Sequence, residues 1–177
     1  TGGEPLVRPR IPELIRQIKE ISGIEKVTLT TNGILLKEQM QALADAGLDS
    51  LNISLDTLDG ECFCKITRRN LLDETLEGIR EAMKYPEVQL KLNCVPLGME
   101  GQDFCGIAEF ARNNPVHVRF IEMMPIGYGS SFAGISQEKI MTLLEQKFGK
   151  LVPYNGKPLG NGPCTYYTVD GFVGKIG

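Results

Sequence analysis

The chain has 177 residues, a mass of 19.5 kDa and a formal charge of −3 from 19 basic and 22 acidic residues. This length fits one domain, and the 42% hydrophobic and 23% charged content argues against disorder, coiled coils and collagen-like repeats. The charge provides no global basic field for nucleic acid or anionic membranes, and no apolar run is long enough to span a bilayer. We therefore expect a cytoplasmic protein that binds neither.

The hydrophobic pattern alternates between helices and strands along the chain. Apolar residues recur at helical spacing in five segments, 11–21, 38–46, 71–85, 103–111 and 136–148. Short β-rich runs stand between them at 26–30, 50–55, 88–95 and 116–121. Such alternation predicts an α/β fold with parallel strands joined by right-handed crossovers, in either a doubly wound sheet or a (β/α) barrel.

The composition changes after Gly149, where proline and glycine become frequent. Two β-rich runs at 165–169 and 172–176 flank Asp170-Gly171, which predicts a hairpin. We therefore divide the chain into a partial barrel at 1–149 and the beginning of a C-terminal extension at 150–177.

The chain opens without Met or a signal-peptide pattern, so we expect an internal fragment. Its cysteines are odd in number and irregularly spaced, which favours reduced thiols and predicts no metal site within the chain. No Cys-x-x-Cys pair occurs, and Cys62 and Cys64 would point to opposite sides of a strand or loop.

Unusual polar residues follow or end the predicted strands. They are Thr30-Thr31-Asn32-Gly33, Ser54-Leu55-Asp56-Thr57, Lys91 with Asn93, and Arg119 with Glu122-Met123-Met124-Pro125. The carboxyl ends of parallel strands form the rim where α/β folds bind ligands, because the loops there vary while the sheet stays rigid. The sequence therefore predicts one site at this rim.

Two of the candidate segments also have a purely structural interpretation. Gly2 and Gly3 allow a ligand to touch the backbone, and Glu4 provides a carboxylate for an ammonium group, but a glycine pair also marks ordinary turns. Thr30 and its neighbours could hydrogen-bond a sugar or base, or simply form a turn at Asn32-Gly33.

Two positively charged residues, Lys91 and Arg119, lie within predicted strands, and this placement favours a role in ligand binding over a purely structural one. We expect Lys91 to be covered on both faces of its sheet, so that its ammonium needs an anionic partner. Arg119 could bind a phosphate, or a carboxylate such as Glu122. His117 is the only histidine, which excludes hydrolytic triads and sites with several histidines. Met124 alone would be core packing more often than a ligand contact.

Taken in order, five motifs resemble the radical S-adenosylmethionine (SAM) superfamily and, within it, the GTP 3',8-cyclases of molybdenum cofactor biosynthesis. The motifs are Thr1-Gly2-Gly3-Glu4-Pro5, Thr30-Thr31-Asn32-Gly33, residues 51–58 (LNISLDTL), Lys91-Leu92-Asn93 and residues 119–125 (RFIEMMP). The glycine-rich motif by itself indicates only the superfamily.

The resemblance implies a partial (β/α)6 TIM-like barrel that lacks its first strand. It also implies that a [4Fe-4S] cluster cleaves SAM to a 5'-deoxyadenosyl radical, which abstracts the ribose 3' hydrogen of GTP. The product would be (8S)-3',8-cyclo-7,8-dihydroguanosine 5'-triphosphate. By this resemblance, SAM-binding residues would be Gly2, Gly3, Glu4, Ser54 and Met124. GTP-binding residues would be Thr30, Lys91 and Arg119. No catalytic or metal-binding residue is assigned.

The family also carries a Cys-x3-Cys-x2-Cys motif and three further cysteines for a second [4Fe-4S] cluster, and neither set is present here. We therefore expect both clusters to be bound outside this fragment, which alone would be inactive. The implied partners are GTP and, downstream, cyclic pyranopterin monophosphate synthase; a homodimer is possible. The alternatives are another radical SAM enzyme, which the two strand cations disfavour, and a non-catalytic nucleotide-binding module.

Overall fold

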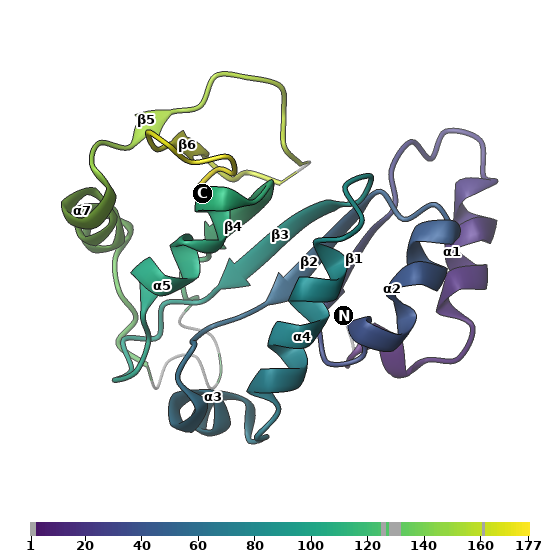
Figure 1. Cartoon of the computed structure of the whole chain (residues 1–177), viewed down its shortest axis with the longest axis horizontal. Helices are drawn as coiled ribbons and strands as arrows, with labels where there is room; N and C mark the ends of the chain where they lie inside the picture. Colours follow the sequence, from purple (N-terminus) through teal and green to yellow (C-terminus); the bar gives the residue numbers. More distant parts are fainter. Residues whose placement is uncertain (1–2, 125–126, 128–131, 161) are drawn as a thin grey trace.

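The computed structural model describes residues 3–124, 127, 132–160 and 162–177. Its centre is a parallel sheet of four strands in the order β1-β2-β3-β4 (Figure 1). The strands are β1 (Thr28–Thr31), β2 (Ser50–Ser54), β3 (Gln89–Cys94) and β4 (Val116–Phe120). The order follows the chain without a reversal, as in a barrel and unlike a doubly wound sheet. The predicted α/β fold with parallel barrel-like strands is confirmed.

Helices connect the strands and cover one face of the sheet (Figure 1). They are η1 (Pro5–Val7), α1 (Ile11–Lys19), α2 (Leu36–Asp45), α3 (Gly60–Thr67), α4 (Leu72–Ala82), α5 (Phe104–Ala108), α6 (Phe110–Asn113) and α7 (Gln137–Phe148). Ser136 caps α7, because its hydroxyl accepts a hydrogen bond from the Lys139 amide.

The helix α3 is not predicted from the sequence, whose pattern indicates a strand or loop around Cys62 and Cys64. Instead, the Asp59 carboxylate accepts a 2.7 Å hydrogen bond from the Cys62 amide and caps a two-turn helix. Cys62 and Phe63 are buried on its inner side. Two buried residues are too few to display the helical period in the sequence, so the pattern does not identify this helix.

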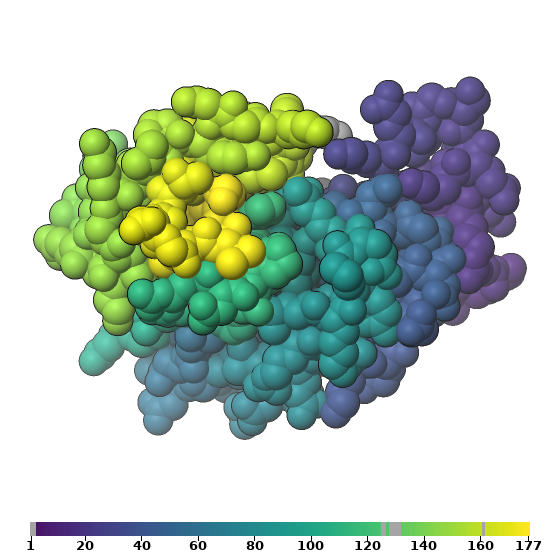
Figure 2. Space-filling view, turned by 45° about the horizontal axis from the view of Figure 1, so that its top comes forward, coloured from purple at the N-terminus to yellow at the C-terminus, as the bar shows by residue number. Residues whose placement is uncertain are grey.

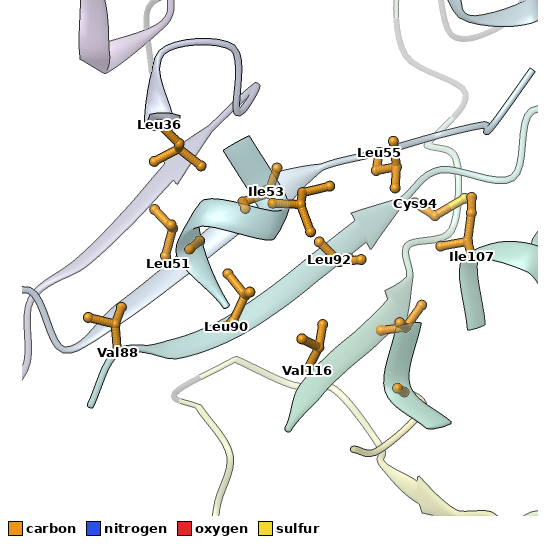
Figure 3. Packing of buried hydrophobic residues seen from close by; sticks show 14 of the residues in the cluster. Leu36, Leu51, Ile53, Leu55, Val88, Leu90, Leu92, Cys94, Ile107 and Val116 are labelled. Atoms are coloured by element: carbon orange, nitrogen blue, oxygen red, sulfur yellow. The ribbon is translucent and has the colours of Figure 1, made fainter. Parts of the chain in front are cut away.

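The core lies between the sheet and these helices. Every second residue of β2, β3 and β4 is apolar and points to the helices, and Figure 3 shows Leu51, Ile53, Leu90 and Leu92 side by side there. All four are almost completely buried. A single covered face therefore produces the alternation of apolar and polar residues along the strands.

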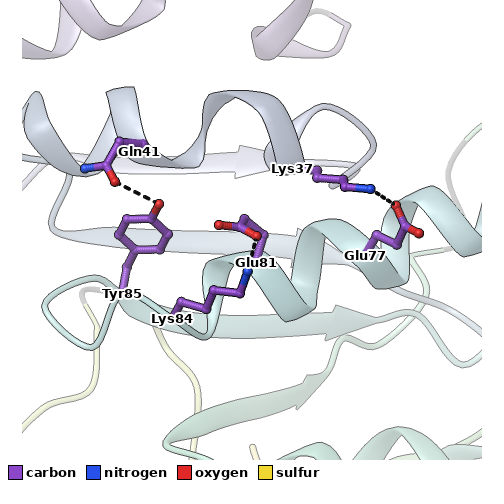
Figure 4. Close-up of polar contacts among 6 residues, drawn as sticks. All are labelled: Lys37, Gln41, Glu77, Glu81, Lys84 and Tyr85. Atoms are coloured by element: carbon purple, nitrogen blue, oxygen red, sulfur yellow. Dashed lines mark hydrogen bonds and ion pairs between the residues drawn. The ribbon is translucent and has the colours of Figure 1, made fainter.

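The packing of α2 against α4 is tight near Gly78 and polar at the surface. A Cβ atom on Gly78 would lie 2.1 Å from the carbonyl oxygen of Gly33, so α4 touches the turn after β1 directly. At the surface, Figure 4 shows Lys37 of α2 paired with Glu77 of α4, at 2.8 Å. Exposed pairs of this kind contribute little to stability, so the close contact at Gly78 defines the approach of the helices.

The C-terminal residues return to the main sheet. The Gly177 amide donates to the Val118 carbonyl and the Phe120 amide donates to the Gly177 carbonyl, so the last residues run parallel to β4. In Figure 2 these yellow residues lie against the green β4 region. The predicted hairpin forms a single bridge, Tyr167 with Ile176, because β6 (Tyr167–Thr168) pairs mainly with β5 (Val152–Pro153). The division of the chain at residue 149 stays a prediction.

Within the described residues, none of the helices combines the length and apolar character that crossing a bilayer requires.

Candidate functional site

The face of the sheet opposite the helices is polar. The parallel register aligns its side chains in rows, such as Thr30, Asn52, Lys91 and His117 across the four strands. We call this surface the polar face; it consists of Thr28, Thr30, Ser50, Asn52, Ser54, Gln89, Lys91, Asn93, His117 and Arg119. All three predicted GTP-binding residues and Ser54 lie on it.

Arg119 is held by two amide side chains. Its Nε atom donates to Oδ1 of Asn93 at 2.8 Å, and an Nη atom donates to Oδ1 of Asn52 at 3.0 Å. The Asn52 amide nitrogen in turn donates to the Thr30 hydroxyl at 3.1 Å. One hydrogen-bonded chain therefore connects all four strands. Among the described residues these two hydrogen-bond partners are neutral, in place of the Glu122 carboxylate that the sequence suggested, so they leave the positive charge of the guanidinium uncompensated.

Lys91 is 3% exposed and lies on β3 beside Arg119. Its ammonium donates to Ser50 Oγ at 3.0 Å and to Gln89 Oε1 at 2.8 Å. Among the described residues, no anionic side chain pairs with this ammonium group, although the sequence led us to expect one. Within the same part of the chain, the polar face also lacks the second layer of apolar residues that would cover the sheet on both sides. Burial lowers the Lys91 pKa to about 8, and the nearby Arg119 charge adds to the effect. An anionic ligand would relieve both penalties.

The only histidine in the chain borders this cation pair. The Lys175 amide donates to His117 Nδ1 at 3.2 Å, so the ring is a neutral tautomer with its proton on Nε2. Burial and the charges of Lys91, Lys175 and Arg119 lower its pKa to about 4. The Tyr166 ring packs edge-on against His117, with ring centres 5.9 Å apart. The C-terminal region thus covers part of the polar face.

The turn after β1 is built by the Glu4 carboxylate. It accepts from the amides of Leu6 and Asn32, at 3.1 and 2.7 Å, and from the Thr31 hydroxyl. The Asn32 side chain accepts from the Ile34 amide, which closes an Asx turn. Thr31 and Asn32 thus serve the turn, whereas Thr30 is exposed on the polar face. The turn interpretation is therefore confirmed for Thr31 and Asn32, and the ligand-binding role of Thr30 stays a prediction.

The other predicted SAM-binding residues are open to solvent. Ser54 is exposed at the end of β2, a Cβ atom added to Gly3 would meet nothing within 4 Å, and Met124 is 69% exposed beyond β4. Within the part of the chain that the structure describes, no hydrogen bond joins Gly3, Ser54 and Met124 to one another. Gly2 and Pro125 lie outside the described residues.

The residues present fit one implied cofactor better than the other. Gly3 and Ser54 leave free space and hydrogen-bonding groups at the ends of the strands, as a SAM site requires. A [4Fe-4S] cluster needs converging thiolates. Among the described residues no three cysteine, histidine or acidic side chains form a group that could hold a metal, and burial raises the pKa of the Cys94 thiol.

A cavity of about 210 Å³ lies elsewhere, between α7 and the C-terminal segment. Phe120, Ile140, Leu144 and Ile176 contribute to its lining, and Thr30, Lys91 and Arg119 do not. It opens beside the apolar core and offers no cation. We therefore place the candidate site at the polar face and not in this cavity.

Sequence reasoning placed Asn93 at the rim but gave neither Asn93 nor Asn52 a binding role, although both hold Arg119. It also omitted Tyr166, which is distant in the chain. The alternation of polar residues within each strand was a usable signal for the two asparagines, since it marks one polar face with period two. No comparable signal exists for Tyr166, because only the return of the chain after α7 brings it to the sheet.

Known proteins match this chain along its whole length. Residues 1–112 match the family model described as the radical SAM superfamily. The chain is 43% identical over 179 residues to "GTP 3',8-cyclase" from Clostridium perfringens (strain SM101 / Type A), and 41% identical over 181 residues to the protein of that name from Pelotomaculum thermopropionicum. These matches cover 100% of this chain but 54% and 55% of the relatives. "Molybdenum cofactor biosynthesis protein 1" from Dictyostelium discoideum is 37% identical, with 29% of its length covered.

Proposed function

The chain belongs to the radical SAM superfamily, and from this membership we propose that it is part of a GTP 3',8-cyclase. The complete protein would convert GTP to (8S)-3',8-cyclo-7,8-dihydroguanosine 5'-triphosphate in molybdenum cofactor biosynthesis. The chain spans about half the length of the curated bacterial relatives it matches. The cluster ligands would lie in the parts of the protein that this chain does not include.

The observation that carries the proposal is the pair of cations on the polar face. Lys91 and Arg119 have only neutral hydrogen-bond partners among the described residues, and their charges act on each other. Like charges this close are unfavourable without an anion between them. A triphosphate supplies several anionic oxygens, and Thr30 provides a hydroxyl on the same face for the sugar or base. A substrate without phosphate would leave both charges uncompensated.

SAM bound to a reduced [4Fe-4S] cluster would supply the radical chemistry. The residues of this chain would bind and orient the two molecules, which is the protein's contribution in cofactor-dependent reactions. We assign the SAM contacts to Gly2, Gly3, Glu4, Ser54 and Met124. The Glu4 carboxylate already fixes the turn after β1, so it would position this rim as well as accept from the SAM ammonium group.

The wider biological setting follows from this proposal. The product would be consumed by cyclic pyranopterin monophosphate synthase. We propose a cytoplasmic location, with a homodimer as the assembly to test.

The test is GTP binding and turnover by the complete protein, prepared without oxygen. Lys91→Ala should weaken GTP binding by about tenfold or more, because a charged hydrogen-bond partner of the phosphates is lost. Lys37→Ala is the matched control, since it removes one positive charge from the opposite surface of the molecule. Mass spectrometry of the nucleotide products after addition of SAM and a reductant measures the cyclisation.

A brown protein with iron–sulfur absorption that forms the cyclised nucleotide is the expected result. Equal GTP affinities of the Lys91→Ala and Lys37→Ala variants would contradict the site. A colourless protein that binds GTP would favour the nucleotide-binding module over the enzyme.

A further inference from the structure

Tyr166 has a buried hydroxyl group without a hydrogen bond. The residue is 8% exposed, and its Oη atom is shielded from solvent with no partner among the described residues. A buried tyrosine hydroxyl normally finds a hydrogen-bond partner, because leaving it unpaired costs folding free energy. An exception in the body of a well-packed protein therefore needs an explanation.

The groups around this hydroxyl suggest what its partner would be. The Arg119 guanidinium and the Cys164 thiol lie beside it, and the ring rests on His117. Burial raises the Tyr166 pKa to about 12, so the hydroxyl keeps its proton and is available as a donor. Arg119 and Lys91 are donors only, whereas the tyrosine oxygen can also accept. Among the described residues, Lys91 and Arg119 donate to different side chains and no acceptor is shared with the Tyr166 hydroxyl.

Tyr166 immediately precedes β6, and its carbonyl oxygen accepts a 2.7 Å hydrogen bond from the Tyr154 amide, which continues the pairing of β5 with β6. Tyr167, the first residue of β6, lines the cavity beside α7, and neighbouring residues of paired extended chain point to opposite sides. The ring contact of Tyr166 with His117 agrees with this direction, since His117 belongs to the polar face. The segment after α7 thus adds one donor to a site that is otherwise built by the sheet.

We propose that Tyr166 is a further substrate-contacting residue, which donates its hydroxyl hydrogen to a phosphate oxygen of the nucleotide held by Lys91 and Arg119. The inference rests on the proposed function. It extends the nucleotide site from the four strands to the C-terminal region, and it explains why the hydroxyl lacks a partner among the described residues.

The experiment compares Tyr166→Phe with the unmodified complete protein, using equilibrium dialysis with GTP and with guanosine. Removal of one hydrogen bond to a charged acceptor should weaken GTP binding by about tenfold or more, and guanosine binding should stay within about twofold. The melting temperature should stay the same or rise, because the variant removes a buried hydroxyl that the folded protein leaves unpaired. Tyr167→Phe is the matched control and should leave GTP binding unchanged.

Three outcomes would overturn the inference. One is a GTP affinity of Tyr166→Phe within twofold of the unmodified protein. The second is an equal loss of GTP and guanosine affinity, which would separate Tyr166 from the phosphates. The third is a lower melting temperature with unchanged GTP affinity, which would assign the hydroxyl a structural role. The Lys91→Ala variant separates a failure of the proposed function from a failure of this inference. If Lys91→Ala binds GTP normally, the proposed function fails. If Lys91→Ala binds GTP weakly and Tyr166→Phe binds it normally, only this inference fails.

Discussion

Arg119 on β4 donates from Nε to Oδ1 of Asn93 on β3, at 2.8 Å. This contact holds the guanidinium against the sheet without neutralising it, because the partner is an amide and not a carboxylate. The neighbouring bond to Asn52 acts in the same way at 3.0 Å. Two fixed donor–acceptor pairs orient the planar group, so that its position is set before any ligand binds.

Asn93→Asp should weaken GTP binding by about tenfold or more without lowering the melting temperature. The aspartate keeps the acceptor for Arg119 but adds a negative charge, which offsets the guanidinium and repels phosphate. Equilibrium dialysis and thermal melting of the complete protein measure the two effects. Gln17→Glu makes the same charge change on the exposed surface of α1 and should leave GTP affinity intact. A tight-binding Asn93→Asp variant would show that Arg119 does not face the phosphates.

GTP affinity should fall as the pH rises through about 8. The Lys91 pKa is lowered to about 8, so the free protein loses the Lys91 charge above this pH. Arg119, Lys26 and Cys164 are the other ionisable groups that act on it; the arginine stays charged, and burial raises the pKa of the Cys164 thiol. Binding isotherms between about pH 7 and pH 9 measure the change.

Lys91→Arg should reduce this dependence on pH, because the guanidinium keeps its proton across the range. Identical pH profiles for the variant and the unmodified protein would assign the dependence to another group.

His117 should make the folded state less stable in mild acid. Its pKa is about 4 in the fold against 6.5 when exposed, so between these values the unfolded chain binds more protons. The stability is therefore fully present above pH 6.5 and decreases as the pH falls towards 4. His117→Gln should melt with a weaker dependence on pH across this window. Equal slopes of melting temperature against pH for both proteins would contradict the buried neutral ring.

Gly78→Ala should destabilise the fold by about 1–3 kcal/mol, the usual range for overpacking. The new Cβ would lie 2.1 Å from the Gly33 carbonyl oxygen, where backbone must move to admit it. Gly60→Ala, at the start of α3, has nothing within 4 Å of its Cβ and is the matched control. It should be neutral or slightly stabilising, since alanine restricts the unfolded chain. Chemical denaturation measures both.

Sequence reasoning predicted the strands and most helices because each has a clear hydrophobic period. The helix α3 was not predicted, because two buried residues and the Asp59 cap form too short a pattern to indicate a helix. The polar face was predicted only in part. Lys91 and Arg119 were identified by their charge, but the hydrogen bonds that hold Arg119 were not predicted. The sequence of a strand does not distinguish an asparagine that faces solvent from one that binds a guanidinium.

The sequence by itself determined the α/β fold, the rim of polar residues and the similarity to a family, since these depend on local periodicity and on residues in a fixed order. The tertiary structure decided which side chains meet. Parallel register aligns Asn52 with Lys91 and Asn93 with Arg119, and the returning chain brings Tyr166 to His117. Such contacts join residues far apart in the chain, so they depend on how the strands pair and not on any local pattern.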